Sequence, residues 1–292
     1  MGFLNALFGG RQLSPEEERQ EQEAKKFDLL KYDGVKAMKM GQADYALRCF
    51  NEALKLRDDL EIHEHMSQVM LRQGDTEGAM AELRKLAEAE PQNAQILIRM
   101  AQVAYMQEDY GTMGEACDKA MKAEPGNAQA CFHAAQARRG QHDAVGAIAM
   151  LTKAIALDDD FADAYLLRAQ TLLAMGDTDT ATADAEWLAG RVGDHEDVLL
   201  LKARIEAAKG NGEAAIHIYN KVVEVNPFCT EAFRERGQLK FNAGDKDGAE
   251  QDMQTVLELD PQQMADVSGE YSAEGIEQRM RQASSLANPL GL

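Results

Sequence analysis

Residues 162–195 decide the fold, and they read ADAYLLRAQTLLAMGDTDTATADAEWLAGRVGDH. Apolar residues recur at helical spacing up to Met175, which predicts an amphipathic helix. Gly176 and Asp177 then end that helix, because glycine adopts the left-handed conformation that closes a helix without steric cost. A second helical run follows and ends near Val192. The stretch is therefore predicted to form two helices joined by a tight turn.

The same pattern returns along the chain at intervals of 33, 34 or multiples of 34 residues. An amphipathic helix pair cannot bury its apolar face alone, whereas stacking on neighbouring pairs buries it. The repeat therefore predicts an all-α solenoid. The residues that keep the period are Pro91, Pro125, Pro227 and Pro261; Gly41, Gly74, Gly176, Gly210 and Gly244; and Ala46, Ala79, Ala147, Ala181, Ala215 and Ala249.

This pattern resembles the tetratricopeptide repeat, which has a small residue at its eighth position, where the two helices cross closely. That position holds Gly34, Ser67, Ala101, Ala135, Ala169, Ala203 and Gly237. The family's alanine at the twentieth position is present in every repeat except one, where Met113 replaces it. The resemblance implies seven helix-turn-helix repeats over 27–261 that form a right-handed superhelix. Their approximate bounds are 27–59, 60–93, 94–127, 128–161, 162–195, 196–229 and 230–263.

Both ends of the array carry additional segments. Residues 1–13 form an apolar tail containing Phe3, Leu4, Leu7 and Phe8, and residues 14–26 are predicted to be a polar helical extension of the first repeat helix. Residues 264–292 are predicted to contain a capping helix from 272 to 285, followed by a loose tail, because the open end of a solenoid exposes apolar surface.

The composition restricts the classes of function. Lys and Arg number 31 against 50 Asp and Glu, which gives a net charge of −19 and disfavours a nucleic-acid partner. No stretch reaches the roughly 18 apolar residues of a membrane-spanning helix, and the N-terminus lacks the features of a secretory signal. We therefore expect a cytoplasmic protein. Peripheral membrane association through the apolar tail is an alternative.

The resemblance implies that the first helix of each repeat lines a concave groove that binds a partner. At the ninth position this chain has a series of glutamines, interrupted by Arg204, whose carboxamides both donate and accept hydrogen bonds. Such a series could pair with the backbone of an extended peptide, although glutamine is also an ordinary exposed helix residue. The glutamines are Gln68, Gln102, Gln136, Gln170 and Gln238.

Two further sets of residues fall at groove positions. One makes the second to fourth repeats locally basic and favours an acidic peptide or a terminal carboxylate. The other is apolar and favours a ligand or self-association, unless packing within the array covers it. The first set is His65, Arg72, Arg99, His133 and Arg139. The second set, in the fourth to sixth repeats, is Phe132, Leu166, Leu167, Leu173, Leu200 and Leu201, and Tyr105 is a further candidate groove residue.

No catalytic constellation is evident. His63 and His65 lack the spacing of a zinc-binding helix, and the chain has neither a glycine-rich phosphate loop nor a nucleophile elbow. We therefore expect a non-enzymatic scaffold or adaptor without a metal or cofactor, whose partner is another protein. The alternatives are a self-associating structural protein, which would be a homo-oligomer, and a peripheral membrane organiser that uses the apolar tail.

Overall fold

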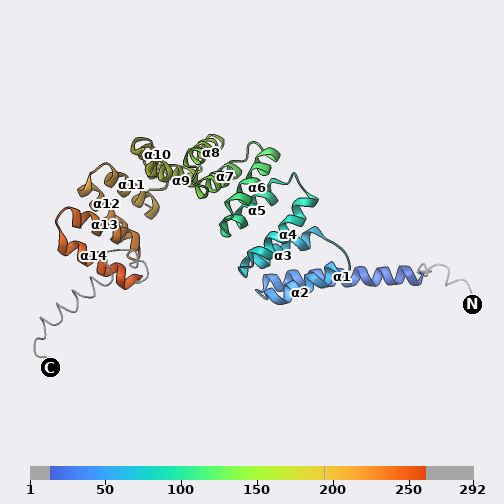
Figure 1. Ribbon diagram of the computed structural model, residues 1–292. Coiled ribbons are helices and arrows are strands. Elements are labelled where there is room, and N and C mark those ends of the chain that lie inside the picture. Colours follow the sequence, from blue (N-terminus) through green and yellow to red (C-terminus); the bar gives the residue numbers. More distant parts are fainter. Residues whose placement is uncertain (1–13, 194, 261–292) are drawn as a thin grey trace, which may run out of the picture. The chain divides into compact units, whose positions relative to one another are not determined.

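A computed structural model describes residues 14–193 and 195–260, and these residues form fourteen α-helices (Figure 1). The first helices of the pairs are α1 (Pro15–Lys39), α3 (Leu60–Arg72), α5 (Ala94–Met106), α7 (Ala128–Gly140), α9 (Ala162–Ala174), α11 (Glu196–Ala208) and α13 (Thr230–Asn242). The second helices are α2 (Ala43–Leu54), α4 (Thr76–Ala89), α6 (Tyr110–Ala123), α8 (Ala144–Leu157), α10 (Thr178–Val192), α12 (Gly212–Val225) and α14 (Lys246–Leu259).

The chain divides into two compact halves, one up to Asp143 and the other from Ala144. Within the N-terminal half, α1 packs on α2, α3 on α4 and α5 on α6, and each pair contacts the next. The C-terminal half repeats this arrangement with α9 on α10, α11 on α12 and α13 on α14. The all-helical class predicted from the sequence is confirmed for the part of the chain that the structure describes.

Local sequence signals explain where the helices begin. Ser14 accepts a hydrogen bond from the backbone of Glu17, whose side chain accepts one from the backbone of Ser14, and Pro15 occupies the first helical position. This capping box satisfies two amides that a helix start leaves unpaired. Asp and Asn side chains cap later helices in the same way, as Asp75 does for α4 and Asn127 for α7.

One turn position separates the two helices of every repeat and requires a positive φ. Glycine fills it in five repeats, and Gly176, with φ 87°, is typical. Glu108 and His142 adopt φ values of 55° and 62° at the equivalent positions of the third and fourth repeats. A side chain in this conformation costs roughly 1–2 kcal/mol, so these two turns carry backbone strain that the other five avoid.

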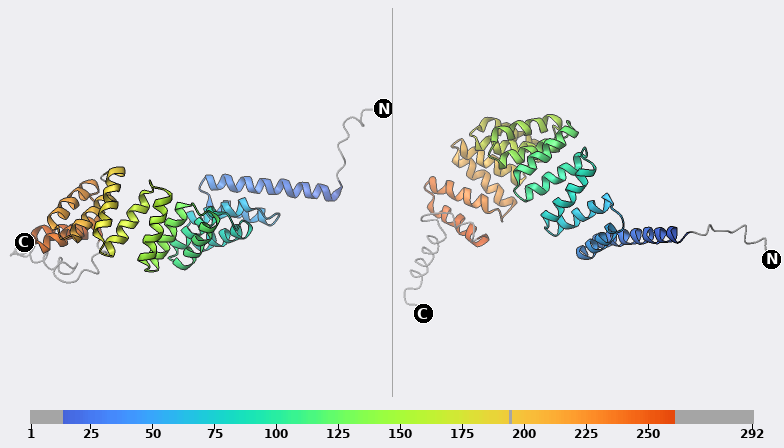
Figure 2. Two further views of the ribbon diagram at one scale, coloured as in Figure 1. Left: turned by 90° about the horizontal axis from the view of Figure 1, so that it is seen from above. Right: turned by 45° about the vertical axis from the view of Figure 1, so that its right-hand side comes forward.

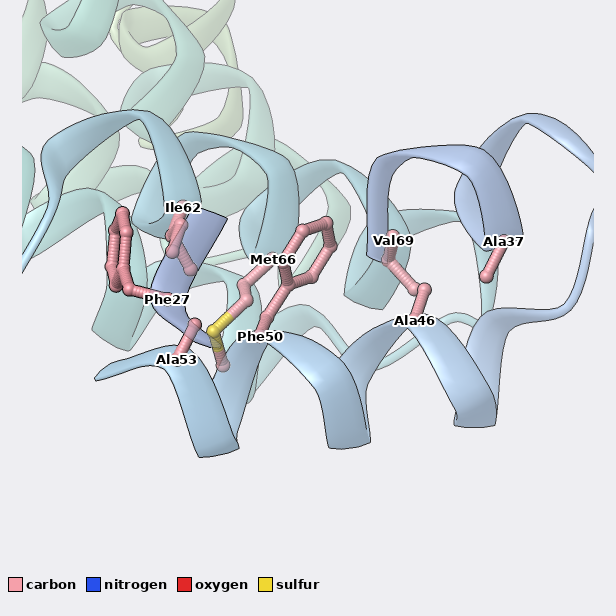
Figure 3. Packing of buried hydrophobic residues seen from close by; sticks show 8 residues of the cluster. All are labelled: Phe27, Ala37, Ala46, Phe50, Ala53, Ile62, Met66 and Val69. Atoms are coloured by element: carbon pink, nitrogen blue, oxygen red, sulfur yellow. The ribbon is translucent and has the colours of Figure 1, made fainter. Parts of the chain in front are cut away.

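The core lies between the paired helices, where small residues allow a close crossing. All residues at the eighth and twentieth positions are buried. A Cβ atom added to Gly34 would lie 2.5 Å from the ring of Phe50, so only glycine fits at this crossing. Figure 3 shows the cluster around it, in which Phe27 and Phe50 from the first pair meet Ile62 and Met66 of α3.

Some predicted features lie outside the described residues. These are the apolar tail 1–13 and the capping segment 264–292. None of the described helices combines the length and the apolarity of a membrane span.

Candidate functional site

In the N-terminal half, the residues predicted to line a groove lie on successive first helices, and they contact one another. We call the side chains at the second, fifth, sixth and ninth positions of α1, α3, α5 and α7 the first-helix row. In this row a residue at position two or six of one helix meets a residue at position five or nine of the preceding helix. Side chains of the first-helix row therefore connect neighbouring repeats to one another. They can also form part of a surface for a partner only where these contacts leave them accessible.

The first such contact joins α1 to α3 through Lys31. Its Nζ atom lies 2.6 Å from Oε2 of Glu61 and 3.1 Å from Oδ1 of Asp59. Glu61 is also near His65, whose Nε2 atom lies 3.5 Å from Oε1 of Glu61. The His65 ring stacks on Phe50 at 5.7 Å between centroids, and its Nδ1 atom is buried without a hydrogen-bond partner among the described residues.

A second contact joins α3 to α5 through Glu64. Arg99 donates from Nη1 to Oε1 of Glu64 at 3.0 Å, and Gln68 donates to the same oxygen at 3.4 Å. The expected locally basic groove thus also contains anions, because Glu64 lies beside Arg99 and Glu61 lies beside His65. Both glutamates occupy groove positions in the sequence, so counting anions as well as cations would have found them.

A third contact joins α5 to α7 through His133. Its Nδ1 atom is 2.8 Å from Oε1 of Gln136, and its Nε2 atom is 3.4 Å from Nε2 of Gln102. A neutral ring with its proton on Nδ1 satisfies both contacts, since it donates to Gln136 and accepts from Gln102. Burial lowers the pKa of His133 and outweighs the opposing hydrogen bond to Gln136. The carboxamides of this row are thus partly engaged within the protein.

The state of His133 predicts a pH dependence of stability. Its pKa in the folded protein is below the ordinary 6.5, so the unfolded chain binds the proton more readily. Stability should fall as the pH drops below about 6.5 towards the lowered value, and this contribution should be fully present at higher pH. Urea unfolding followed by circular dichroism should show that acidification lowers the free energy of unfolding less for His133→Gln than for the wild type. An equal loss in both proteins would contradict this assignment.

Beyond this row, the C-terminal ends of α3, α5 and α7 carry four side chains that we call the binding strip: Arg72, Tyr105, Met106 and Arg139. Tyr105 is 47% exposed and Met106 58% exposed, and both arginines are exposed. Neither arginine forms an ion pair with a residue that the structure describes. The strip therefore offers two exposed guanidinium groups, one on the first helix before that of Tyr105 and one on the first helix after it.

Tyr110, at the start of α6, packs against the Tyr105 ring of the binding strip. Its ring meets Tyr105 edge to face at 6.3 Å between centroids. Gln141 donates to its backbone oxygen at 2.8 Å, and a Cβ atom added to Gly140 would lie 2.4 Å from the ring. The absence of a side chain at Gly140 thus lets Tyr110 pack against the end of α7. The Tyr105 ring therefore contacts Tyr110 on one side and stays partly exposed to solvent.

In the C-terminal half, two predicted groove leucines belong to the core. Leu200 is 7% exposed and Leu201 only 1% exposed, so packing within the array covers both side chains. Leu201 packs in the cluster of Leu172 and Leu188, which removes its side chain from any accessible surface. The remaining predicted side chains of this half that stay partly accessible are Leu166, Leu167, Gln170 and Leu173, whereas Gln238 is exposed. Phe132 in the N-terminal half is also partly accessible.

Arg204 is engaged in a polar cluster between the last two repeats. It donates from Nε to both carboxylate oxygens of Glu235, at 3.1 and 2.9 Å, and it also pairs with Glu231. Tyr219 donates to Oε2 of Glu235 at 2.5 Å. Burial opposes ionisation of Glu235, but the hydrogen bonds from Arg204 and Tyr219 prevail and lower its pKa. Arg204 therefore holds α11 to α13, and its guanidinium has little capacity left for a ligand.

Sequence reasoning missed a second class of ion pair, which lies inside single repeats. Arg168 forms a bidentate pair with Asp184, and Arg236 forms the equivalent pair with Asp252. Both carboxylates are buried, at 4% and 3% exposure. The signal was an Arg and an Asp sixteen residues apart at the same positions of two repeats. These pairs bind the first helix of a repeat to its second helix.

Comparison with known proteins supports the repeat architecture. Family models described as tetratricopeptide repeat match residues 60–103, 138–183, 166–224 and 200–263, which together make up more than half of the chain. No curated protein sequence matches the chain.

Solved structures with the same fold are similar over most of their lengths. A tetratricopeptide repeat protein from Parabacteroides merdae has a TM-score of 0.69 at 14% identity, over 87% of this chain and 97% of that one. PilW, a type IV pilus biogenesis factor, has a TM-score of 0.63 at 15% identity, over 69% and 94%. YrrB, a repeat protein with an unusual peptide-binding site, has a TM-score of 0.50 at 16% identity, over 62% and 94%. Because the family models match more than half of the chain and the structure has the paired helices of such repeats, the chain belongs to the tetratricopeptide repeat family.

Proposed function

We propose that the chain is a non-enzymatic adaptor that holds an extended segment of another protein across the binding strip. Repeats of this family typically serve as non-catalytic protein-interaction modules. The observation that carries the proposal is the placement of Arg72, Tyr105, Met106 and Arg139 on three successive first helices. Tyrosine and arginine dominate the binding energy of protein interfaces, because they combine large contact area with directed hydrogen bonds.

The chemistry of the strip specifies the partner segment. Two guanidinium groups favour carboxylates, which they bind with paired hydrogen bonds. Tyr105 and Met106 favour an apolar side chain between those carboxylates, and methionine adapts to irregular shapes. The proposed ligand is therefore an extended peptide with an apolar residue flanked by acidic ones. YrrB, which shares the fold, is described as having a peptide-binding site.

The strip predicts which substitutions abolish binding. Peptides selected from a random display library on the wild-type protein should be enriched in acidic residues next to apolar ones. The variant Arg72→Glu with Tyr105→Ala should bind a selected peptide at least about 30-fold more weakly, since hot-spot residues contribute about 2 kcal/mol or more. Fluorescence anisotropy with a labelled peptide measures this change.

A control makes a charge change twice as large but places it away from the strip. Arg84→Glu with Lys119→Glu alters two exposed cations on α4 and α6 and should retain the wild-type affinity. Arg99 and Gln102 are poor choices for this test because they contact Glu64 and His133, so their substitution would also disturb the packing of the repeats. The proposal fails if the library yields no such peptides, or if both double variants bind equally.

A further inference from the structure

The exposed face of α1 differs from the same face of every later first helix. At the third position of the repeat, Leu29 is 60% exposed, whereas Ile62 and Ile96 are 0% and 4% exposed. Tyr32 at the sixth position is 65% exposed. In later repeats this face is covered, and Ile62 packs against Phe50 of the preceding repeat. No described helix precedes α1 and covers this face. Leu29 and Tyr32 are therefore exposed to solvent, although their side chains are of the kind found in interfaces.

This face continues along the whole of α1 as a stripe with an ordered charge pattern. We define the α1 stripe as Glu18, Gln22, Lys25, Leu29, Tyr32 and Lys36, which recur at intervals of four and three residues and therefore share one helix face. All six are exposed. The stripe begins with the acidic Glu18 and ends with the basic Lys36. Between them lie Gln22, Lys25, which is paired with Glu21 of the same helix, and the apolar residues Leu29 and Tyr32. Figures 1 and 2 show that the N-terminal half of α1 continues past α2 with no other described helix beside it.

We propose that the α1 stripe is a self-complementary surface that pairs with the α1 stripe of a second copy, in antiparallel orientation. A two-fold axis near residue 27 places Glu18 of each copy opposite Lys36 of the other. Both residues are without an ion pair among the residues that the structure describes. The same axis places Leu29 of each copy near the centre, opposite Lys25 of the other, and Tyr32 opposite Gln22. A parallel pairing would instead place Glu18 against Glu18 and Lys36 against Lys36.

The dimensions of α1 suit such a pairing. Glu18 and Lys36 are about 27 Å apart along a helix that rises 1.5 Å per residue, so the two ion pairs lie at opposite ends of the contact. A two-fold interface uses the same patch on both copies. Because the stripe is acidic at one end and basic at the other, opposite charges meet only when the two helices are antiparallel. One helix pair buries less surface than a standard interface, so we expect an affinity in the micromolar range. This inference does not depend on the proposed peptide binding.

Charge reversal tests the pairing and its orientation together. Sedimentation velocity of the full chain should show a monomer–dimer equilibrium for the wild type between roughly 1 and 500 µM, at a salt concentration that screens the long-range repulsion between two acidic copies. Glu18→Lys alone and Lys36→Glu alone should each weaken association by tenfold or more. An equimolar mixture of the two variants should associate like the wild type, because each copy then offers the charge that the other needs.

Controls separate the contact from effects on the helix itself. Glu16→Lys makes the same charge change in the first turn of α1 but lies off the stripe, so it should leave association unchanged. Circular dichroism checks that every variant keeps its helix content. The proposal is overturned if the wild type stays monomeric over the whole range, if the mixture fails to associate, or if Glu16→Lys weakens association as much as Glu18→Lys does.

Discussion

Arg168→Met should lower the free energy of unfolding of the C-terminal half by about 3–5 kcal/mol, because it leaves a buried carboxylate without its partner. Arg168 donates from Nε and Nη2 to Asp184 at 2.9 and 2.6 Å, and Asp184 is only 4% exposed. The Asp184 carboxylate would then lie in a poorly solvated site without a positive partner, which destabilises the fold.

Trp187 provides a local measurement of this effect. It is the sole tryptophan of the chain, and its ring stacks on Tyr165 at 3.8 Å between centroids. Arg168 lies over the other ring of this stack, 5.4 Å from the centroid of Tyr165. Urea unfolding followed by Trp187 fluorescence therefore reports on the repeat that contains the ion pair.

Two comparison variants sharpen this prediction. Arg168→Met combined with Asp184→Leu removes both charges and should recover most of the lost stability. Arg236→Met should cost less than Arg168→Met, because Lys240 remains 2.9 Å from Oδ2 of Asp252. A loss below about 1 kcal/mol for Arg168→Met would show that Asp184 does not depend on this partner.

Leu201→Ala should destabilise the C-terminal half by about 2–5 kcal/mol, although its place in the repeat suggests an exposed groove residue. Leu201 is 1% exposed and shares its cluster with Leu172, Leu188 and Ile205. Removing its side chain leaves a cavity that neighbouring side chains fill only in part. Trp187 packs against this cluster, so its fluorescence during urea unfolding measures the loss.

A matched leucine distinguishes a core role from a surface role. Leu157 at the end of α8 is 42% exposed, and Leu157→Ala should cost less than about 1 kcal/mol. If both variants cost equally little, Leu201 is not a core residue and its assignment to a ligand surface would have to be restored.

The fold was predictable from the sequence because backbone geometry imposes strict requirements at a few positions. A turn with positive φ favours glycine, and a close helix crossing requires a residue as small as Gly34. These requirements recur in every repeat, so the period reveals them. Glu108 shows that one repeat can depart from the pattern and still form the turn, since its backbone adopts φ 55°.

The site was less predictable, because its chemistry depends on how side chains of neighbouring repeats meet. The period places Arg99 and Glu64 on the same kind of face, but only the packing of α3 and α5 brings them to 3.0 Å. Burial likewise depends on the neighbours. Leu167 and Leu201 share the sixth position, yet Leu167 is half-buried and Leu201 is fully buried. Equivalent positions in a repeat therefore do not have equivalent roles.

The central claim is that the binding strip contacts acidic side chains of the partner peptide, and a charge-swap titration tests it most directly. Isothermal titration calorimetry would compare a selected peptide with a version whose acidic residues are replaced by lysine, on the wild type and on Arg72→Glu with Arg139→Glu. We predict that the wild type prefers the acidic peptide at least tenfold and that the variant prefers the lysine peptide. If the variant shows the same preference as the wild type, the peptide does not bind at the strip.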